Sequence, residues 1–212
     1  INEGKKMKIK DIIIDGSGKN NFGWLATKKW IPMPSLLRET MTQYKLRRQL
    51  KDTKIRTWWR FWASPFDKKK FTDDLDALSN FYKDEGHRDF TILSDSIYYS
   101  KKKKGLIVRI NILEGSKYKF RNFSWEGNSL YGENVLQSAL NLNKGDIFSQ
   151  TGFDKAVFQD VQSLYMDRGY LYSNIEPFFT PAGKDSMDVH FSVTENNKVY
   201  VRNINIYGNS KT

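Results

Sequence analysis

The sequence lacks cysteine altogether, which excludes a disulfide framework and a thiolate-bound zinc site. It has only two histidines, His87 and His190, and their positions indicate no metal site. No apolar run approaches the roughly 18 residues that a membrane-spanning helix needs, and the first residues lack the zones of a signal peptide. We therefore expect any export signal or membrane anchor to lie outside this stretch. No catalytic constellation emerges either, so we predict no enzyme and no cofactor.

The 212 residues suffice for one large domain or two small ones, and 39% hydrophobic residues with 15% aromatic residues support packed cores. The net charge of +11 raises the question of a nucleic acid or an anionic membrane as partner. The basic residues, however, are spread along the chain: Lys68 to Lys70 begin one predicted helix, and Lys101 to Lys104 form a turn. This distribution favours ordinary solvation of turns and helix faces, and we expect no nucleic acid as partner.

A pattern of nine residues recurs three times, as "KIKDIIIDG" (Lys8 to Gly16), "KFRNFSWEG" (Lys119 to Gly127) and "YVRNINIYG" (Tyr200 to Gly208). Each copy alternates apolar residues with a period of two and ends on glycine, which is typical of a strand with one buried face. An arrangement that recurs along a chain indicates repeated structural units. The third copy has no helices or hairpin after it, so we predict that its final residues fray or pair with another chain.

A second pattern, a tyrosine four residues before a glycine, occurs at Tyr82 with Gly86 and at Tyr165 with Gly169. Apolar residues at helical spacing precede each pair, and the glycine suits a helix C-cap in the left-handed conformation. Two alternating strands joined by a turn follow each glycine, so that each hairpin has one buried and one solvated face.

Each unit therefore reads strand, helix, helix, strand, strand. In the first unit the predicted helices and hairpin strands span residues 43–52, 67–84, 89–99 and 106–113. In the second unit they span residues 133–142, 153–167, 171–180 and 187–194. Two helices that cover one face of a small mixed sheet would bury the apolar stripes of both layers, so the predicted fold class is α+β.

Five motifs carry a family resemblance: "WEGNS" (Trp125 to Ser129), "YMDRGY" (Tyr165 to Tyr170), "ILEGSKYKF" (Ile112 to Phe120), "YVRNINIYGN" (Tyr200 to Asn209) and "TKIRTWWRFW" (Thr53 to Trp62). They resemble the polypeptide-transport-associated (POTRA) domains of the outer-membrane protein assembly factor BamA superfamily, most closely the third and fourth domains of the array. His87 departs from the aromatic residue that the family has after the glycine. Asn196-Asn197 replaces the last Glu-Gly.

The resemblance implies a tandem of two POTRA domains, each β-α-α-β-β with a three-stranded mixed sheet covered on one face by two helices. It places the tail of a preceding domain at residues 1–6 and the first domain at residues 7–115, with an insertion at about residues 17–42. The second domain then spans residues 116–197, and residues 198–212 are the truncated first strand of a following domain.

The resemblance also implies a periplasmic segment of an outer-membrane β-barrel assembly factor, whose full-length protein is anchored in the bacterial outer membrane by a C-terminal β-barrel. Its implied partners are unfolded outer-membrane β-barrel proteins, accessory assembly lipoproteins and neighbouring POTRA domains. The implied action is to bind clients by β-strand augmentation and to scaffold the accessory subunits for membrane insertion. A POTRA region of a related two-partner secretion transporter is an alternative within the superfamily.

An exposed sheet edge accepts a guest strand through main-chain hydrogen bonds, which require no particular guest sequence. The candidate edge residues are Thr91, Leu93, Asp95, Ile97 and Tyr99 in the first unit, and Tyr172, Asn174, Glu176 and Phe178 in the second. Pro177 weakens the second edge because it has no N–H to donate. Both edges can also be merely solvated or covered by a neighbouring domain.

A cluster of tryptophan and arginine between the predicted helices of the first unit is a second candidate, for a partner interface. It comprises Arg56, Trp58, Trp59, Arg60 and Trp62. Tryptophan and arginine are typical interface anchors, and they can equally stack nucleic-acid bases or fold back as a satellite core. A basic, aromatic-rich nucleic-acid-binding tandem is therefore the alternative function.

Overall fold

The computed structural model describes residues 8–16, 44–55, 66–102, 104–205 and 208. The chain divides into two units, the first comprising Ile1–Lys117 with Phe148–Gln150 and the second Tyr118–Ile147 with Thr151–Thr212. Each unit contains one three-stranded sheet with helices on it.

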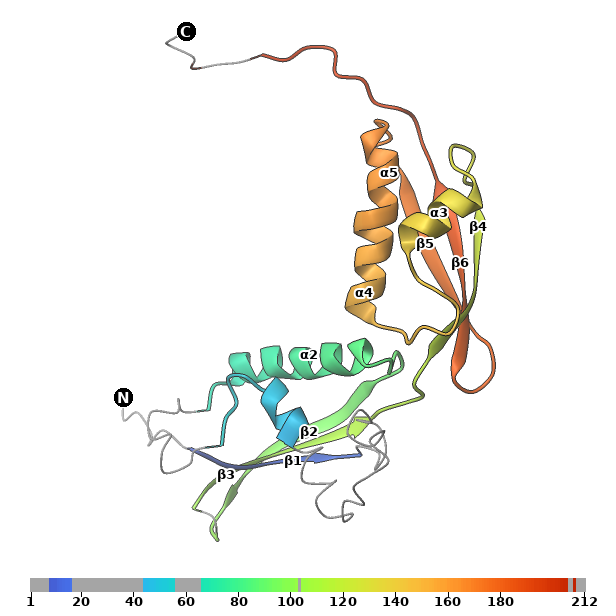
Figure 1. Ribbon diagram of the computed structural model, residues 1–212. Helices are drawn as coiled ribbons and strands as arrows, with labels where there is room; N and C mark the ends of the chain where they lie inside the picture. Colours follow the sequence, from blue (N-terminus) through green and yellow to red (C-terminus); the bar gives the residue numbers. More distant parts are fainter. Residues whose placement is uncertain (1–7, 17–43, 56–65, 103, 206–207, 209–212) are drawn as a thin grey trace, which may run out of the picture. The chain divides into compact units, whose positions relative to one another are not determined.

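The first sheet has the strand order β1-β3-β2 (Figure 1). Its strands are β1 (Ile9–Asp15), β2 (Thr91–Ser100) and β3 (Gly105–Leu113). The last strand in the sequence, β3, lies in the centre, parallel to β1 and antiparallel to β2. This order confirms the predicted mixed sheet and leaves β2 at an edge.

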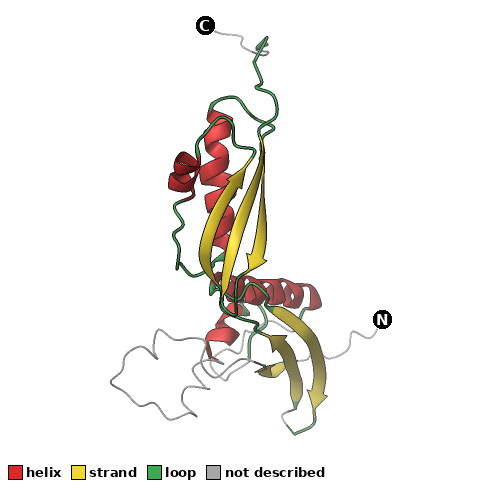
Figure 2. Cartoon of the chain, turned by 90° about the vertical axis from the view of Figure 1, so that its right-hand side faces the viewer, coloured by secondary structure: helices red, strands yellow, loops and turns green. Residues whose placement is uncertain are grey.

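Helix α2 (Lys68–Asp84) and a shorter helical stretch at residues 44–49 accompany this sheet. Asp67 begins α2 by accepting hydrogen bonds from two main-chain N–H groups of the first turn, which is the usual role of an N-cap aspartate. The core joins the apolar faces of both layers and includes Ile12, Ile14, Leu46, Leu50, Phe71, Leu78, Tyr82, Val108 and Ile110. In each unit the helices lie on one face of the sheet (Figure 2).

The second unit repeats this order. Its sheet, β4-β6-β5, is built from β4 (Lys119–Glu126), β5 (Asn174–Pro181) and β6 (Ser186–Thr194). Its helices are α3 (Glu133–Leu140) and a longer helix composed of α4 (Gln150–Lys155), a π-helical segment (Ala156–Val161) and α5 (Gln162–Asp167). The sequence predicted one helix from Phe153. The observed helix begins three residues earlier and widens in its middle turns, which apolar periodicity alone does not reveal.

The glycine that ends each first strand is required by close packing. Gly16 and Gly127 have φ angles of +96° and +81°, in the left-handed region that glycine adopts easily. A Cβ atom on either would lie 2.1 Å from a main-chain oxygen of the central strand, that of Ile112 or Val193. The recurring strand-end glycine thus has the same physical cause in both units.

The third copy of the nine-residue pattern differs from the first two. Residues 198–205 belong to no strand, and Tyr200, Val201 and Ile204 are 77–78% exposed. Gly208 nevertheless has a φ angle of +82°, close to those of Gly16 and Gly127. The segment therefore shares the glycine conformation that ends a first strand, but it pairs with no strand among the described residues.

A buried tyrosine–glutamate contact ties the helix to the hairpin of the first unit. The Tyr82 hydroxyl donates a hydrogen bond to Glu114 at 3.0 Å, and burial together with this carboxylate raises the pKa of Tyr82 far above its ordinary value. In the second unit burial and then the Glu195 carboxylate likewise raise the pKa of Tyr165. The register aligns Glu195 with Glu114, because each follows the residue that ends its hairpin.

This alignment corrects one expectation from the sequence. The counterpart of the Glu-Gly at residues 114–115 is Glu195 with Asn196, and Asn196-Asn197 does not replace it. Asn196 has a φ angle of +54° and Gly115 one of +68°. Asparagine tolerates this left-handed conformation better than most residues, so the glutamate is retained and only the glycine is exchanged.

Candidate functional site

The hydrogen-bond direction along β3 determines which groups of β2 are free. The Leu106 N–H donates to the Lys8 carbonyl at 2.9 Å, so the main chain of Leu106 points toward β1. Tyr99 lies opposite Leu106, and its own N–H and C=O therefore point away from β3, to the side of β2 where no other described strand pairs. We call this side the free edge. Residues two apart share the direction, so Ile97 and Asp95 also present their main chains there.

A β-bulge divides β2. Ile92 pairs with Ile112 and Ser94 with Asn111, so Leu93 has no partner residue in the ladder. Thr91, on the other side of the bulge, lies opposite Leu113. Leu113 is an odd number of residues from Leu106, so its main chain points toward β2, and the main chain of Thr91 points toward β3. Of the five residues predicted for this edge, the structure therefore groups Asp95, Ile97 and Tyr99 along a regular free edge. It places Leu93 in the bulge and Thr91 in the ladder.

The free edge of β5 has a different chemistry. The Ala182 N–H donates to the Ser186 carbonyl at 2.8 Å, and the register makes the even-numbered residues of β5 the ones bonded to β6. The main chains that point to the free edge belong to Ile175, Pro177, Phe179 and Pro181. The two prolines have no N–H, so half of these four positions cannot donate a hydrogen bond.

The residues predicted for the second edge do not present their main chains there. Asn174, Glu176 and Phe178 are even-numbered and turn their main chains to β6. Tyr172 precedes β5, which begins three residues later than the predicted strand, and its carbonyl accepts a hydrogen bond from Asn196 Nδ2 at 2.6 Å. The alternation of apolar residues identified the strand. It could not show whether the odd- or the even-numbered residues direct their main-chain N–H and C=O groups to the partner strand.

The two edges correspond residue by residue through the repeat. Asp95 lies opposite Ile110 as Pro177 lies opposite Phe191, and Tyr99 lies opposite Leu106 as Pro181 lies opposite Met187. The prolines of the second unit thus occupy the positions that offer free donors in the first unit. Among the described residues, β2 therefore presents unpaired main-chain donors on its outer side, and β5 presents fewer of them.

The outer strands on the opposite side of each sheet are interrupted at matching positions. The register of β1 shifts between Ile9 and Asp11, and that of β4 between Phe120 and Asn122. These irregularities leave Lys10 and Arg121 unpaired in the ladder. Bulges of this kind reduce the tendency of an edge to pair with another strand.

The open face of the second sheet bears a row of polar cross-strand contacts. Ser124 Oγ lies 2.9 Å from His190 Nδ1, and His190 Nε2 lies 3.2 Å from Glu126 Oε2. Arg121 forms two hydrogen bonds with Asp188, which lower the pKa of the Asp188 carboxyl. Serine, histidine and glutamate are the residue types of a hydrolase triad. Here the Glu126 side chain is 76% exposed, and the three side chains form a row of cross-strand contacts on the solvent-exposed face of the sheet.

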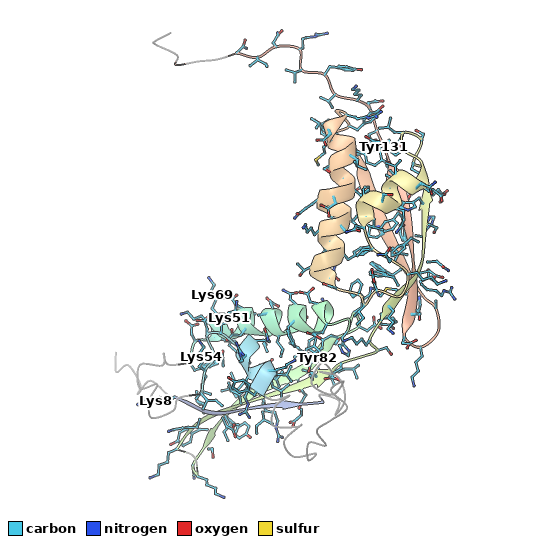
Figure 3. The ribbon with its side chains drawn as sticks, viewed as in Figure 1. Lys8, Lys51, Lys54, Lys69, Tyr82 and Tyr131 are labelled. Atoms are coloured by element: carbon cyan, nitrogen blue, oxygen red, sulfur yellow. The ribbon has the colours of Figure 1, made fainter. Side chains whose placement is uncertain are left out.

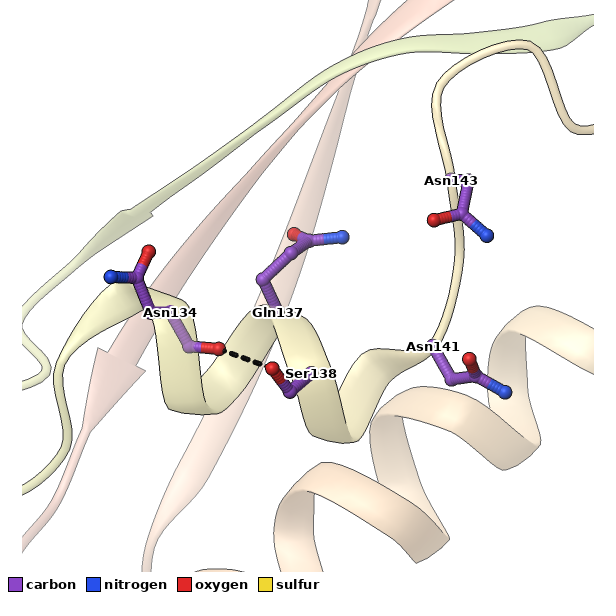
Figure 4. A pocket seen from close by; sticks show the side chains of 5 residues that line it. All are labelled: Asn134, Gln137, Ser138, Asn141 and Asn143. Atoms are coloured by element: carbon purple, nitrogen blue, oxygen red, sulfur yellow. Dashed lines mark hydrogen bonds between the residues drawn. The ribbon is translucent and has the colours of Figure 1, made fainter.

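A shallow hollow of about 440 Å³ lies along α3 (Figure 4). It is lined by Asn134, Gln137, Ser138, Asn141 and Asn143, and Ser138 Oγ donates to the Asn134 carbonyl within it. This lining offers amide and hydroxyl groups without a charged side chain. Among the described residues no cluster of three or more histidine or acidic side chains suits a metal ion.

The tryptophan and arginine cluster predicted as a partner interface, from Arg56 to Trp62, lies outside the described residues, as does the predicted insertion at residues 17–42. In the part of the chain that is described, no helix is both long and apolar enough to cross a membrane.

Two helices on a three-stranded mixed sheet, repeated in tandem with a central last strand, define a class of small α+β repeat domains. The sequence model of the POTRA family, described as the surface antigen variable number repeat, matches residues 37–115 and 118–196. The chain belongs to the POTRA family.

Its relatives include outer membrane protein assembly factors named BamA. That of Neisseria meningitidis is 27% identical over 215 residues, which cover 100% of this chain and 24% of the relative. That of Buchnera aphidicola is 24% identical over 216 residues, covering 100% of this chain and 31% of the relative. The chain thus spans less than a third of either protein. The crystal structure of Haemophilus influenzae BamA POTRA3-5 matches with a TM-score of 0.64 at 19% identity, covering 97% of this chain and 73% of that one.

Proposed function

We propose that this chain is the POTRA segment of an outer-membrane protein assembly factor, and that its first unit binds unfolded β-barrel clients at the free edge of β2. The observation that supports this most directly is the regular run of outward main-chain groups at Asp95, Ile97 and Tyr99. A guest strand that pairs there extends the sheet by one strand.

This mode of binding suits clients that differ in sequence. Main-chain hydrogen bonds supply the affinity, and the guest side chains alternate between the two faces of the sheet. On the helix face they would lie beside Ile97, which packs against the core. On the open face they would lie beside Tyr98, which is 42% exposed. Partly apolar surroundings on both faces favour strands that carry hydrophobic residues.

The likeness to BamA extends the proposal to the intact protein. We infer a periplasmic position at the outer membrane, a C-terminal membrane barrel, neighbouring POTRA domains and accessory lipoproteins that the segment scaffolds. Candidate surfaces for such subunits include the cluster from Arg56 to Trp62. In this role the units bind and position other proteins and catalyse no reaction.

A salt titration tests the proposal against the nucleic-acid alternative. The whole chain is titrated with a fluorescent peptide from a barrel strand and with a single-stranded oligonucleotide, at low and at high salt. We expect peptide binding that changes little with salt, because main-chain hydrogen bonds involve no release of counterions. Oligonucleotide binding, if present, falls steeply. Absence of peptide binding at every salt concentration refutes the strand-docking proposal.

A further inference from the structure

The tertiary structure gathers lysines that the sequence keeps apart. The Leu106 N–H bonds the Lys8 carbonyl, so the start of β1 lies beside the start of β3. The turn between β2 and β3 ends at that same place. It brings Lys8 and Lys10 to the exposed lysines of the turn, Lys101, Lys102 and Lys104. One end of the first sheet thus carries five described lysines from two segments about 90 residues apart.

The helix layer adds more lysines at the same end. Tyr82, in the last turn of α2, bonds Glu114 just after the end of β3, so the first turn of α2 lies toward the start of β3. That first turn contains Lys68, Lys69 and Lys70. Lys51 and Lys54 join them, because Asp52 and Thr53 between them donate main-chain hydrogen bonds to Asp74 of α2. Lys8, Lys51, Lys54 and Lys69 lie at one end of the first unit in Figure 3. We call these ten lysines the basic end.

Few lysines of the basic end form a direct ion pair. All ten lysines are exposed, and within the described part of the chain only Lys70 forms an ion pair, at 3.9 Å from Asp52. The first turn of α2 has no acidic residue, although a helix N-terminus favours acids and disfavours lysines. At the opposite end of the unit, by contrast, Lys117 pairs with Glu85 at 3.9 Å.

We propose that the basic end binds the anionic phosphate headgroups of a phospholipid bilayer. Lysine ammonium groups are flexible and strongly hydrated, so they attract a charged surface without a fixed geometry. The ten lysines come from both layers of the unit, a spread that suits an extended anionic surface better than a single small ligand. Tyr98 and Tyr99, 42% and 53% exposed, lie near the end of β2, just before Ser100 and the lysine turn. An aromatic ring with a polar tip beside lysine is typical of the membrane–water interface. Tyr98 and Tyr99 also belong to the strand that would dock a guest, so the test below changes only lysines.

Vesicle flotation of the whole chain tests this proposal. The vesicles are neutral phosphatidylcholine, alone or mixed with anionic phosphatidylglycerol, at low and at high salt. We expect binding to the anionic vesicles only, and weaker binding at the higher salt. The variant K8E/K101E/K102E is compared with K144E/K155E/K184E, which changes exposed lysines of the second unit by the same net charge. With roughly a fivefold loss per lysine at the surface, the first variant should bind at least about tenfold more weakly than the second.

Four results would overturn the proposal. Equal losses in the two variants would mean that net charge alone governs binding, and binding to neutral vesicles would mean that the headgroup charge is not recognised. Unchanged binding of K8E/K101E/K102E would exclude the basic end as the site. Competition is the fourth test: if polyglutamate or an oligonucleotide at equal charge concentration displaces the vesicles completely, the partner is a polyanionic polymer and not a bilayer. Circular dichroism of both variants confirms that they fold.

Discussion

Proline substitution at two positions of β2 should close the free edge without breaking the sheet. The variant D95P/Y99P removes the N–H groups that point away from β3 and leaves the bonds between β2 and β3 in place. The chain itself contains the precedent, because Pro177 and Pro181 occupy the corresponding positions of β5. We therefore expect the variant to fold with a small change in thermal stability.

The magnitude follows from the number of hydrogen bonds lost. A guest strand on the free edge would accept one hydrogen bond from each of these two N–H groups. Each such bond contributes about 0.5–1.5 kcal/mol net, so the variant loses about 1–3 kcal/mol of binding free energy. At about 1.4 kcal/mol per factor of ten, the dissociation constant for a barrel-strand peptide rises about 5- to 150-fold.

Fluorescence anisotropy with a labelled barrel-strand peptide measures this change, and D95A/Y99A is the matched control. The control loses the same side chains and keeps both N–H groups, so it should bind within about twofold of the wild type. Equal losses in the two variants would show that side chains carry the binding. Unchanged binding of D95P/Y99P would refute the use of this edge.

The reciprocal exchange strengthens the test. The variant P177D/P181Y gives β5 the residues of the open edge and restores two outward N–H groups. Calorimetry should then find two peptide sites per chain, whereas we expect one in the wild type. A wild-type stoichiometry of two would contradict the conclusion that the prolines impair β5.

Three further predictions concern stability and ionisation. Gly127→Ala should lower the unfolding free energy by more than about 2 kcal/mol, because its Cβ would lie 2.1 Å from a carbonyl oxygen of β6 and the residue has a left-handed backbone conformation. Thermal denaturation measures this loss. Gly132→Ala at the N-cap of α3 is the control and should cost clearly less, because a Cβ there meets open space. His87→Phe should stabilise the first unit by about 1–3 kcal/mol, because the buried imidazole, 1% exposed, has no hydrogen-bond partner among the described residues. The corresponding residue of the second unit, Tyr170, is aromatic. A lower melting temperature of the variant would contradict this prediction. Arg121→Ala should raise the pKa of Asp188, whose carboxyl the guanidinium holds below its ordinary value. Because the folded pKa is depressed, the wild-type pair stabilises the fold above the ordinary aspartate pKa and ceases to do so as the pH falls through the folded value; an NMR titration that finds an unchanged pKa would refute this.

Most of the fold could be predicted because its signals are local and occur twice. The period of two in the first strands and hairpins, the helical spacing before Tyr82 and Tyr165, and the strand-end glycines each report on neighbouring residues. The repeat then cross-checks every element against its copy. The π-helical turns at Ala156–Val161 could not be predicted in this way, because widening one turn hardly changes the apolar pattern.

The candidate edge was predicted less completely. The alternation of residues identified β2 as a strand. At the bulge, however, the odd- and even-numbered residues exchange sides, and no residue type near Leu93 indicates that bulge. Pro177 was recognisable in the sequence as a missing donor. Only the register with β6 shows that the nitrogen of Pro177 faces the free edge. The same register shows that Pro181 removes a second donor from that edge.

By itself, the sequence determined the repeated unit, its α+β class and the family, since these rest on the order and periodicity of residues along the chain. Only the tertiary structure decided which main-chain groups remain free and where distant charges meet. Hydrogen-bond direction depends on the pairing register between strands, and Lys8 comes to lie beside the turn at Lys101 only when β1 pairs with β3. The open edge and the basic end are therefore properties of the folded unit.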